Sequence, residues 1–247
     1  MSATQGAVPF GAWPSPISAE RVSTGGVGLD AICHIGPSVW WAELRPSEGG
    51  RVVLVRCDRA GATVDALPAP FSARTRVHEY GGGAWFAGPD AVYFSNWGDQ
   101  RLHRLEFDEH GAPVDGAEPH PITPEPETAS AWRYADGRVT PDGDWIVAVR
   151  EDHSPAVVEA HGEAANTLVA LPADGSAAPK VIFSGTDFVA APRISPDGRW
   201  VSWITWNHPD MPWDATRLCA APLWLHGDEL RLGNTQVVAG GDEVSVV

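Results

Sequence analysis

Four polar residues in one short segment have side chains that could contact a peptide. They are two arginines, a histidine and a glutamate, at positions Arg74, Arg76, His78 and Glu79. Guanidinium groups bind carboxylates, and imidazole and carboxylate groups exchange hydrogen bonds with a peptide main chain. We expect these four side chains to line the axial channel of a ring-shaped fold and to touch a passing peptide.

Three consecutive glycines at 81–83 follow this group and complete the sequence His-Glu-Tyr-Gly-Gly-Gly. A glycine run of this kind can aim backbone N–H groups at a developing oxyanion. The flanking segments, however, are strand-like, and no nucleophile follows. The glycines are therefore predicted to allow close backbone packing at the inner strand of a sheet.

The chain lacks a nucleophile elbow. An α/β-hydrolase carries its serine in the pentapeptide G-x-S-x-G, on a sharp turn between strand and helix, and no such pentapeptide occurs here. The nearest match, Gly36-Pro37-Ser38, continues into the apolar residues Val39 and Trp40 and is predicted to be a turn. No catalytic residue is predicted in this chain.

Two loops carry groups that bind metals in other proteins, at 151–153 (Glu-Asp-His) and 207–210 (Asn-His-Pro-Asp). Neighbouring side chains of one short loop rarely converge on a single ion, and the sequence shows no third group. Both loops are therefore predicted to be hydrogen-bonded, or to form a polar rim that faces another domain, and no metal or cofactor is expected. Three aspartates are expected to fix loops by accepting backbone N–H bonds: Asp136, Asp187 and Asp214.

The charge of the chain argues against two classes of partner. The sequence has 17 basic and 32 acidic residues, a formal net charge of −15, and Lys180 is its only lysine. Such a surface repels the phosphates of nucleic acids and of anionic membranes.

Targeting and redox features are also absent from the sequence. No apolar run approaches the roughly 18 residues of a membrane span, and residues 1–16 do not resemble a signal peptide. Three scattered cysteines suggest neither disulfides nor zinc. We expect a cytoplasmic protein.

An internal repeat predicts the fold. Four apolar runs begin at Val39, Val92, Ile146 and Val201, at spacings of 53, 54 and 55 residues. This period is near that of propeller blades, each of which is a four-stranded antiparallel sheet. A pair of β-sandwiches is the alternative, but sandwiches do not repeat at a constant period.

Two of the repeats contain a predicted hairpin. Thr-Pro-Asp-Gly at 140–143 and Ser-Pro-Asp-Gly at 195–198 suit type I turns, and each leads into a strand that begins with tryptophan. Between the hairpins, strands are predicted at 166–171 and 180–183, on either side of a turn at 173–175. The second repeat is predicted to contain strands at 91–95 and 101–107.

The predicted fold is all-β, an incomplete β-propeller of about four blades. The blade-equivalents cover roughly 28–75, 76–130, 131–185 and 186–240. Tryptophans of the repeated strands are expected to fill the gaps between neighbouring sheets, where large apolar side chains are buried: Trp40, Trp41, Trp145, Trp200 and Trp203.

Five segments together resemble a known family. They are 10–17 (FGAWPSPI), 77–84 (VHEYGGGA), 93–102 (YFSNWGDQRL), 142–153 (DGDWIVAVREDH) and 203–214 (WITWNHPDMPWD). They are similar to the propeller of bacterial acylaminoacyl- and dipeptidyl-peptidase-like members of the prolyl oligopeptidase family of serine peptidases. The resemblance implies that the chain is part of a seven-bladed propeller, which precedes an α/β-hydrolase domain and restricts entry to its active site.

This resemblance implies a role without catalysis. The chain would be a gating and substrate-filtering propeller fragment, its partners a peptide substrate and a C-terminal hydrolase domain, and the catalytic Ser, Asp and His would lie outside this sequence. The alternative is a stand-alone, closed four-bladed propeller that binds a protein or peptide. An open ring would expose apolar blade faces and a closed one would not. A third class, an enzyme with an unrecognised metal or carboxylate site, has no sequence feature in its favour.

Overall fold

The structure is a computed structural model that describes residues 9, 11–12, 15–23 and 25–246. Phe10, Trp13 and Pro14, which belong to the first family-like segment, lie outside the described residues. The helices of the described part are short: α1 (Ala19–Ser23), a 3₁₀ turn (Pro46–Glu48) and α2 (Pro155–His161). Among these described residues, neither α-helix has the length or apolar character to cross a membrane.

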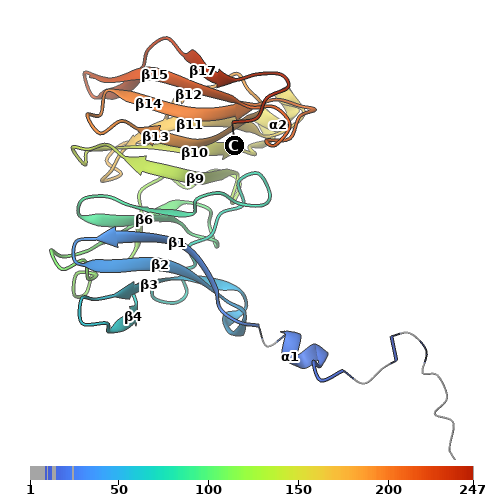
Figure 1. Ribbon diagram of the computed structural model, residues 1–247. Coiled ribbons are helices and arrows are strands. Elements are labelled where there is room, and N and C mark those ends of the chain that lie inside the picture. Colours follow the sequence, from blue (N-terminus) through green and yellow to red (C-terminus); the bar gives the residue numbers. More distant parts are fainter. Residues whose placement is uncertain (1–8, 10, 13–14, 24, 247) are drawn as a thin grey trace, which may run out of the picture.

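Four antiparallel sheets form a stack in chain order, with the first and last sheets at opposite ends (Figure 1). The first three sheets each add their strands in sequence order. The first contains β1 (Gly28–Ile35), β2 (Ser38–Arg45), β3 (Arg51–Cys57) and β4 (Thr63–Asp65). The second contains β5 (Trp85–Ala87), β6 (Ala91–Ser95), β7 (Leu102–Glu106) and β8 (His120–Pro121). The third contains β9 (Trp132–Val139), β10 (Trp145–Asp152), β11 (Ala165–Pro172) and β12 (Lys180–Phe183).

The fourth sheet differs from the predicted four strands. It contains β13 (Phe188–Ile194), β14 (Trp200–Trp206), β15 (Arg217–His226), β16 (Glu229–Leu232) and β17 (Gln236–Gly240). The long β15 has two partners on its outer side, because β16 pairs with its second half and β17 with its first half. The outermost position of this sheet is therefore divided between two short strands.

The predicted repeat is confirmed. Each of the four apolar runs lies in the second strand of its sheet, in β2, β6, β10 and β14. The two Pro-Asp-Gly turns close hairpins, since Gly143 N–H donates to Thr140 O at 2.9 Å and Gly198 N–H donates to Ser195 O at 2.8 Å. An all-β, incomplete propeller is the fold.

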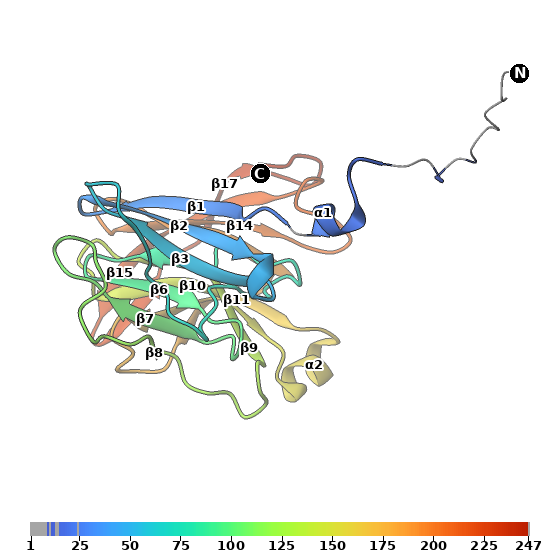
Figure 2. The same cartoon turned by 90° about the horizontal axis from the view of Figure 1, so that it is seen from below.

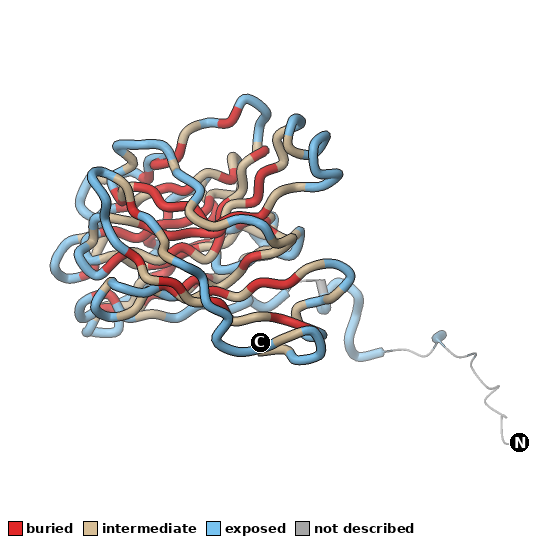
Figure 3. The backbone as a smooth tube through the Cα atoms, turned by 90° about the horizontal axis from the view of Figure 1, so that it is seen from above, coloured by how far each residue is buried: buried red, intermediate tan, exposed pale blue. Residues whose placement is uncertain are grey.

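Apolar side chains fill the gaps between successive sheets. One buried cluster joins the first two sheets, a second joins the middle two, and a third joins the last two. Trp40 and Trp203 are fully buried in the first and third clusters. Figure 3 shows the buried segments running through the strands while the loops around them are exposed.

The expectation that all five repeat tryptophans are packed between sheets is wrong for Trp200, which is 42% exposed. Trp200 belongs to the fourth sheet, which has no described sheet beyond it. The outer surfaces of the stack are apolar there and at the other end: Leu29 and Ile32 of β1 and Val237 and Val238 of β17 are all more than half exposed. The stack is open, not a closed ring.

The loops lie at two ends of the sheets. We call one end the connector face: it holds the links from second to third strands at 46–50, 96–101, 153–164 and 207–216, and the links between sheets at 66–84, 122–131 and 184–187. Helices α1 and α2 lie at this same end in two perpendicular views (Figures 1 and 2). The tight hairpins lie at the opposite end.

Candidate functional site

The connector face carries all four predicted peptide contacts. Arg74 and Arg76 lie on the same indole, since their guanidinium carbons are 4.4 and 4.3 Å from the ring centroid of Trp97. Guanidinium groups at this distance are attracted to the aromatic face. The backbone of Arg76 is fixed as well, because its N–H donates to Oε1 of Gln100 at 2.7 Å. Neither guanidinium forms an ion pair within the described part of the chain, so both positive charges remain available.

His78 is inserted between sheets rather than presented to solvent. Its Nε2 is 3.1 Å from the amide oxygen of Asn166, and its ring packs against Phe188 and Trp206. Burial lowers the pKa of His78 below its usual value, and the nearby Glu151 charge opposes this only in part. A buried neutral imidazole is the form that this environment favours.

Glu79 belongs to a charged network that joins two sheets. Arg133 donates to Oε1 of Glu79 at 2.7 Å and to Oε2 of Glu151 at 3.3 Å. His153 Nε2 lies 2.6 Å from the same Glu151 oxygen. The hydrogen bond from Arg133 lowers the pKa of Glu79. Arg133 and Glu151 face each other as paired residues of β9 and β10, which is why the network forms at this strand end.

The structure separates the predicted peptide contacts into two kinds. Neither Arg74 nor Arg76 forms an ion pair with a described carboxylate, whereas His78 and Glu79 are occupied by neighbours in the same chain. Arg133, the centre of the network, was not predicted. Its partner Glu151 is 18 positions away, and only the pairing register of β9 with β10 brings them together.

The glycine run packs against the next sheet, as predicted. Gly83 N–H donates to Oδ1 of Asp136 at 2.6 Å, and Gly81 N–H donates to Val77 O at 2.8 Å. A Cβ on Gly83 would lie 2.7 Å from the Asp136 carboxylate oxygen, so a larger residue does not fit without a shift. These two N–H groups already have partners inside the fold and do not point at an oxyanion position.

The three aspartates that were expected to fix loops do so. Asp136 accepts from Gly83 N–H, Asp187 accepts from His208 N–H at 2.8 Å, and Asp214 accepts from Met211 N–H at 3.1 Å. Each carboxylate thereby holds a backbone group that would otherwise lack a strand partner.

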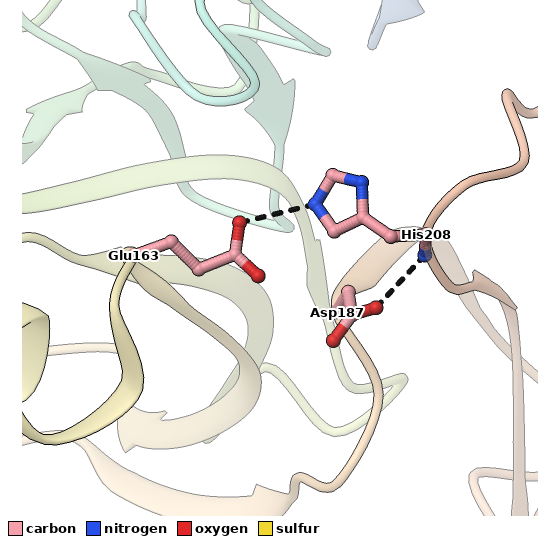
Figure 4. Close-up of side chains that lie close together, drawn as sticks. All are labelled: Glu163, Asp187 and His208. Carbon is pink, nitrogen blue, oxygen red and sulfur yellow. Dashed lines mark hydrogen bonds and ion pairs between the residues drawn. The ribbon is translucent and has the colours of Figure 1, made fainter.

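The loops at 151–153 and 207–210 contain hydrogen-bonded side chains, as predicted. His208 of the second loop lies close to residues that the sequence did not group with it. Glu163 Oε2 lies 3.0 Å from His208 Nε2, and the ligand atoms of Glu163, Asp187 and His208 are all within 4.8 Å of one another. Figure 4 shows the three side chains converging from separate loops. Glu163 follows α2, and nothing in its local sequence marks it.

A hollow of about 500 Å³ lies at the opposite end from these residues. It is bordered by turn residues of three sheets, among them Asp90, Asp144 and Asp174. None of the predicted peptide contacts lines it.

Comparison with known proteins finds similar solved structures. The sequence matches no family model, and no curated protein matches it. A puromycin-hydrolyzing peptidase from Mycobacterium tuberculosis is 37% identical over 96% of this chain, with a TM-score of 0.77. The chain matches the propeller portion of peptidases of the prolyl oligopeptidase family. A puromycin hydrolase is 36% identical over the same share, with a TM-score of 0.78.

This chain covers only 36% of the length of those prolyl oligopeptidase-family peptidases and corresponds to their propeller portion. A mutant of puromycin hydrolase has also been solved in complex with PGG, and its match is of the same extent. A prolyl endopeptidase is 14% identical with a TM-score of 0.53, a likeness of fold alone.

Proposed function

We propose that this chain is the gating and substrate-filtering propeller of a prolyl oligopeptidase-type serine peptidase, and that it has no catalytic activity of its own. Its partner would be an α/β-hydrolase domain that cleaves short peptides. The observation that carries this proposal is the similarity to two peptidases. Nearly the whole chain is 36–37% identical to them, but it corresponds to only about a third of their length.

The connector face is the surface that we assign to the hydrolase domain. The N-terminal helix α1 lies at this face, so the chain enters the propeller there (Figure 2). Tyr80 and Trp213, which belong to its loops, are 68% and 69% exposed. Exposed aromatic side chains surrounded by polar groups are typical of protein interfaces.

Arg74 and Arg76 are the proposed contacts for the peptide substrate. Their guanidinium groups are held on Trp97 and have no carboxylate partner among the described residues. A peptide carboxylate would find two donors there with little loss of side-chain entropy, because stacking on the indole already restricts both arginines. His78 and Glu79 would act indirectly, by holding the loop that carries the arginines.

The alternative of a closed, self-sufficient four-bladed propeller is not favoured. Its first and last sheets would have to meet, whereas they lie at opposite ends of the stack with exposed apolar residues on both (Figure 1). The cytoplasm remains the proposed location.

A direct assay tests the absence of catalysis. The purified chain is incubated with chromogenic aminoacyl and acyl-aminoacyl substrates. It is also incubated with puromycin, the compound that a similar peptidase hydrolyses. We expect release of product at the rate of the buffer blank. Turnover that copurifies with the chain and exceeds the blank would refute the proposal.

A further inference from the structure

Glu163, Asp187 and His208 form a cluster whose chemistry suits a metal ion. The three side chains come from separate segments of the chain: the link after α2, the link before β13 and the loop after β14. One imidazole nitrogen and two carboxylates are ligands that zinc accepts. Glu163 and His208 are exposed and Asp187 is half-buried, so an ion can enter from solvent.

The spacing is close to that of a coordination shell. Ligand atoms bound to a tetrahedral zinc lie roughly 3.4 Å apart, given bonds of about 2.0–2.2 Å. Glu163 Oε2 and His208 Nε2 are already 3.0 Å apart, and the whole set is within 4.8 Å. Movements of about an ångström would bring the three ligand atoms to tetrahedral spacing, and a water molecule would supply the fourth ligand.

The charge balance of the cluster points independently to a cation. Three other groups of carboxylates in the described structure each share an arginine. Arg45 serves Glu43, Glu48 and Asp65; Arg104 serves Asp90 and Glu106; Arg133 serves Glu79 and Glu151.

Glu163 and Asp187 have no such partner. Among the described residues, no arginine or lysine lies within ion-pair distance of either carboxylate, and His208 is their only basic neighbour. Two carboxylates held this close repel each other unless a positive charge lies between them. A divalent cation bound by all three residues would provide that charge.

The two ligands from the fourth sheet are held in place before any ion binds. Asp187 N–H donates to Oδ1 of Asn207 at 2.9 Å, and Asp187 Oδ2 accepts from His208 N–H at 2.8 Å. The His208 ring also packs edge-on against Phe188, with centroids 4.9 Å apart. Groups that orient metal ligands in this way raise the affinity of a site.

We propose that Glu163, Asp187 and His208 bind one Zn²⁺ ion, which clamps the third sheet to the fourth at the connector face. The ion would bridge Glu163, which follows α2 of the third sheet, to Asp187 and His208, which flank strands of the fourth. The proposed ion has a structural role only, and the proposal does not depend on the peptidase function.

Titration calorimetry with ZnCl₂ on chelator-treated chain at pH 7.5 tests the proposal. We expect one ion per chain at micromolar Kd or tighter, and a rise in Tm of about 5–10 °C at 100 times Kd. Glu163→Gln removes one ligand charge without touching the loop bonds of Asp187, and it should weaken binding at least tenfold. His208→Ala should abolish it.

Two nearby substitutions are the matched controls. Glu159→Gln and His161→Ala change exposed residues of α2 that are outside the cluster, so both should bind zinc as the unmodified chain does. Circular dichroism confirms that each variant is folded. The proposal is overturned if the unmodified chain fails to bind zinc at 100 μM, or if Glu163→Gln and His208→Ala bind it unchanged.

Discussion

Oδ1 of Asp136 accepts the backbone N–H of Gly83 at 2.6 Å, and its Oδ2 accepts the N–H of Ala191 at 3.0 Å. One carboxylate in the third sheet thereby holds the inner edges of the second and fourth sheets. Asp136 and Ala191 have positive φ angles of 56° and 52°, at bulges where the first strand of each sheet loses its regular pairing. The bulge in β13 leaves the N–H of Ala191 free of a strand partner, and Asp136 accepts it together with the N–H of Gly83 from the link before β5.

Asp136→Ala should lower the free energy of unfolding by about 2–4 kcal/mol, because two backbone donors lose a charged acceptor. Urea denaturation measures the change. Asp144→Ala is the control, since Asp144 is exposed and its side chain forms no hydrogen bond with any described residue; it should change stability by less than about 0.5 kcal/mol. Equal effects of the two substitutions would show that Asp136 does not link the sheets.

Gly137, the next residue, lies against an aromatic ring of the second sheet. A Cβ on Gly137 would overlap the ring of Phe86, which is 7% exposed and cannot move into solvent freely. Gly137→Ala should therefore cost at least about 2 kcal/mol of stability. Gly241→Ala, where a Cβ would meet nothing within 4 Å, should be nearly neutral. A neutral Gly137→Ala would mean that the second and third sheets are farther apart than described.

The hairpins and the central strands of the sheets could be predicted from the sequence, because short local segments determine them. Turn residues at 140–143 and 195–198 determine the hairpins, and the apolar runs determine which strands are central. The contacts between sheets depend on register and on bulges, which apolar patterns do not encode. Neither the grouping of Glu163 with His208 nor the contact of Arg133 with Glu79 could be predicted, because the paired residues are 45 and 54 positions apart in the sequence.

Arg133→Gln should destabilise the chain by about 3 kcal/mol, because Glu151 is 5% exposed and would lose its cation. Arg217→Gln offers the comparison: Arg217 pairs with Asp242 at the surface, and its loss should cost less than about 1 kcal/mol. Chemical denaturation at low salt measures the loss of unfolding free energy in both variants. Losses of similar size would contradict a structural role for the Arg133 network.

The stability of the chain should depend on pH through His78. Burial lowers the pKa of His78 in the folded state, so the unfolded chain binds more protons between that value and the unfolded pKa near 6.5. The free energy of unfolding therefore falls as the pH drops below about 6.5. His78→Asn, which tolerates the positive φ of 55° at this position, should reduce the fall between pH 7.5 and 5.0.

His226→Asn is the control for this pH effect, because His226 is exposed. It should leave the pH dependence of the urea midpoint unchanged. If His78→Asn and the unmodified chain lose the same free energy over this range, the imidazole of His78 is not buried in its neutral form.

The gating role is tested most directly in a chimera. The matching segment of the mycobacterial puromycin-hydrolyzing peptidase is replaced by this chain, and hydrolysis rates are measured for a series of peptides of increasing length, from a chromogenic aminoacyl substrate to a long unstructured polypeptide. The account predicts that the folded chimera cleaves the short substrates and that its rate falls steeply with length. A folded, active chimera that cleaves long and short substrates at similar rates would contradict it.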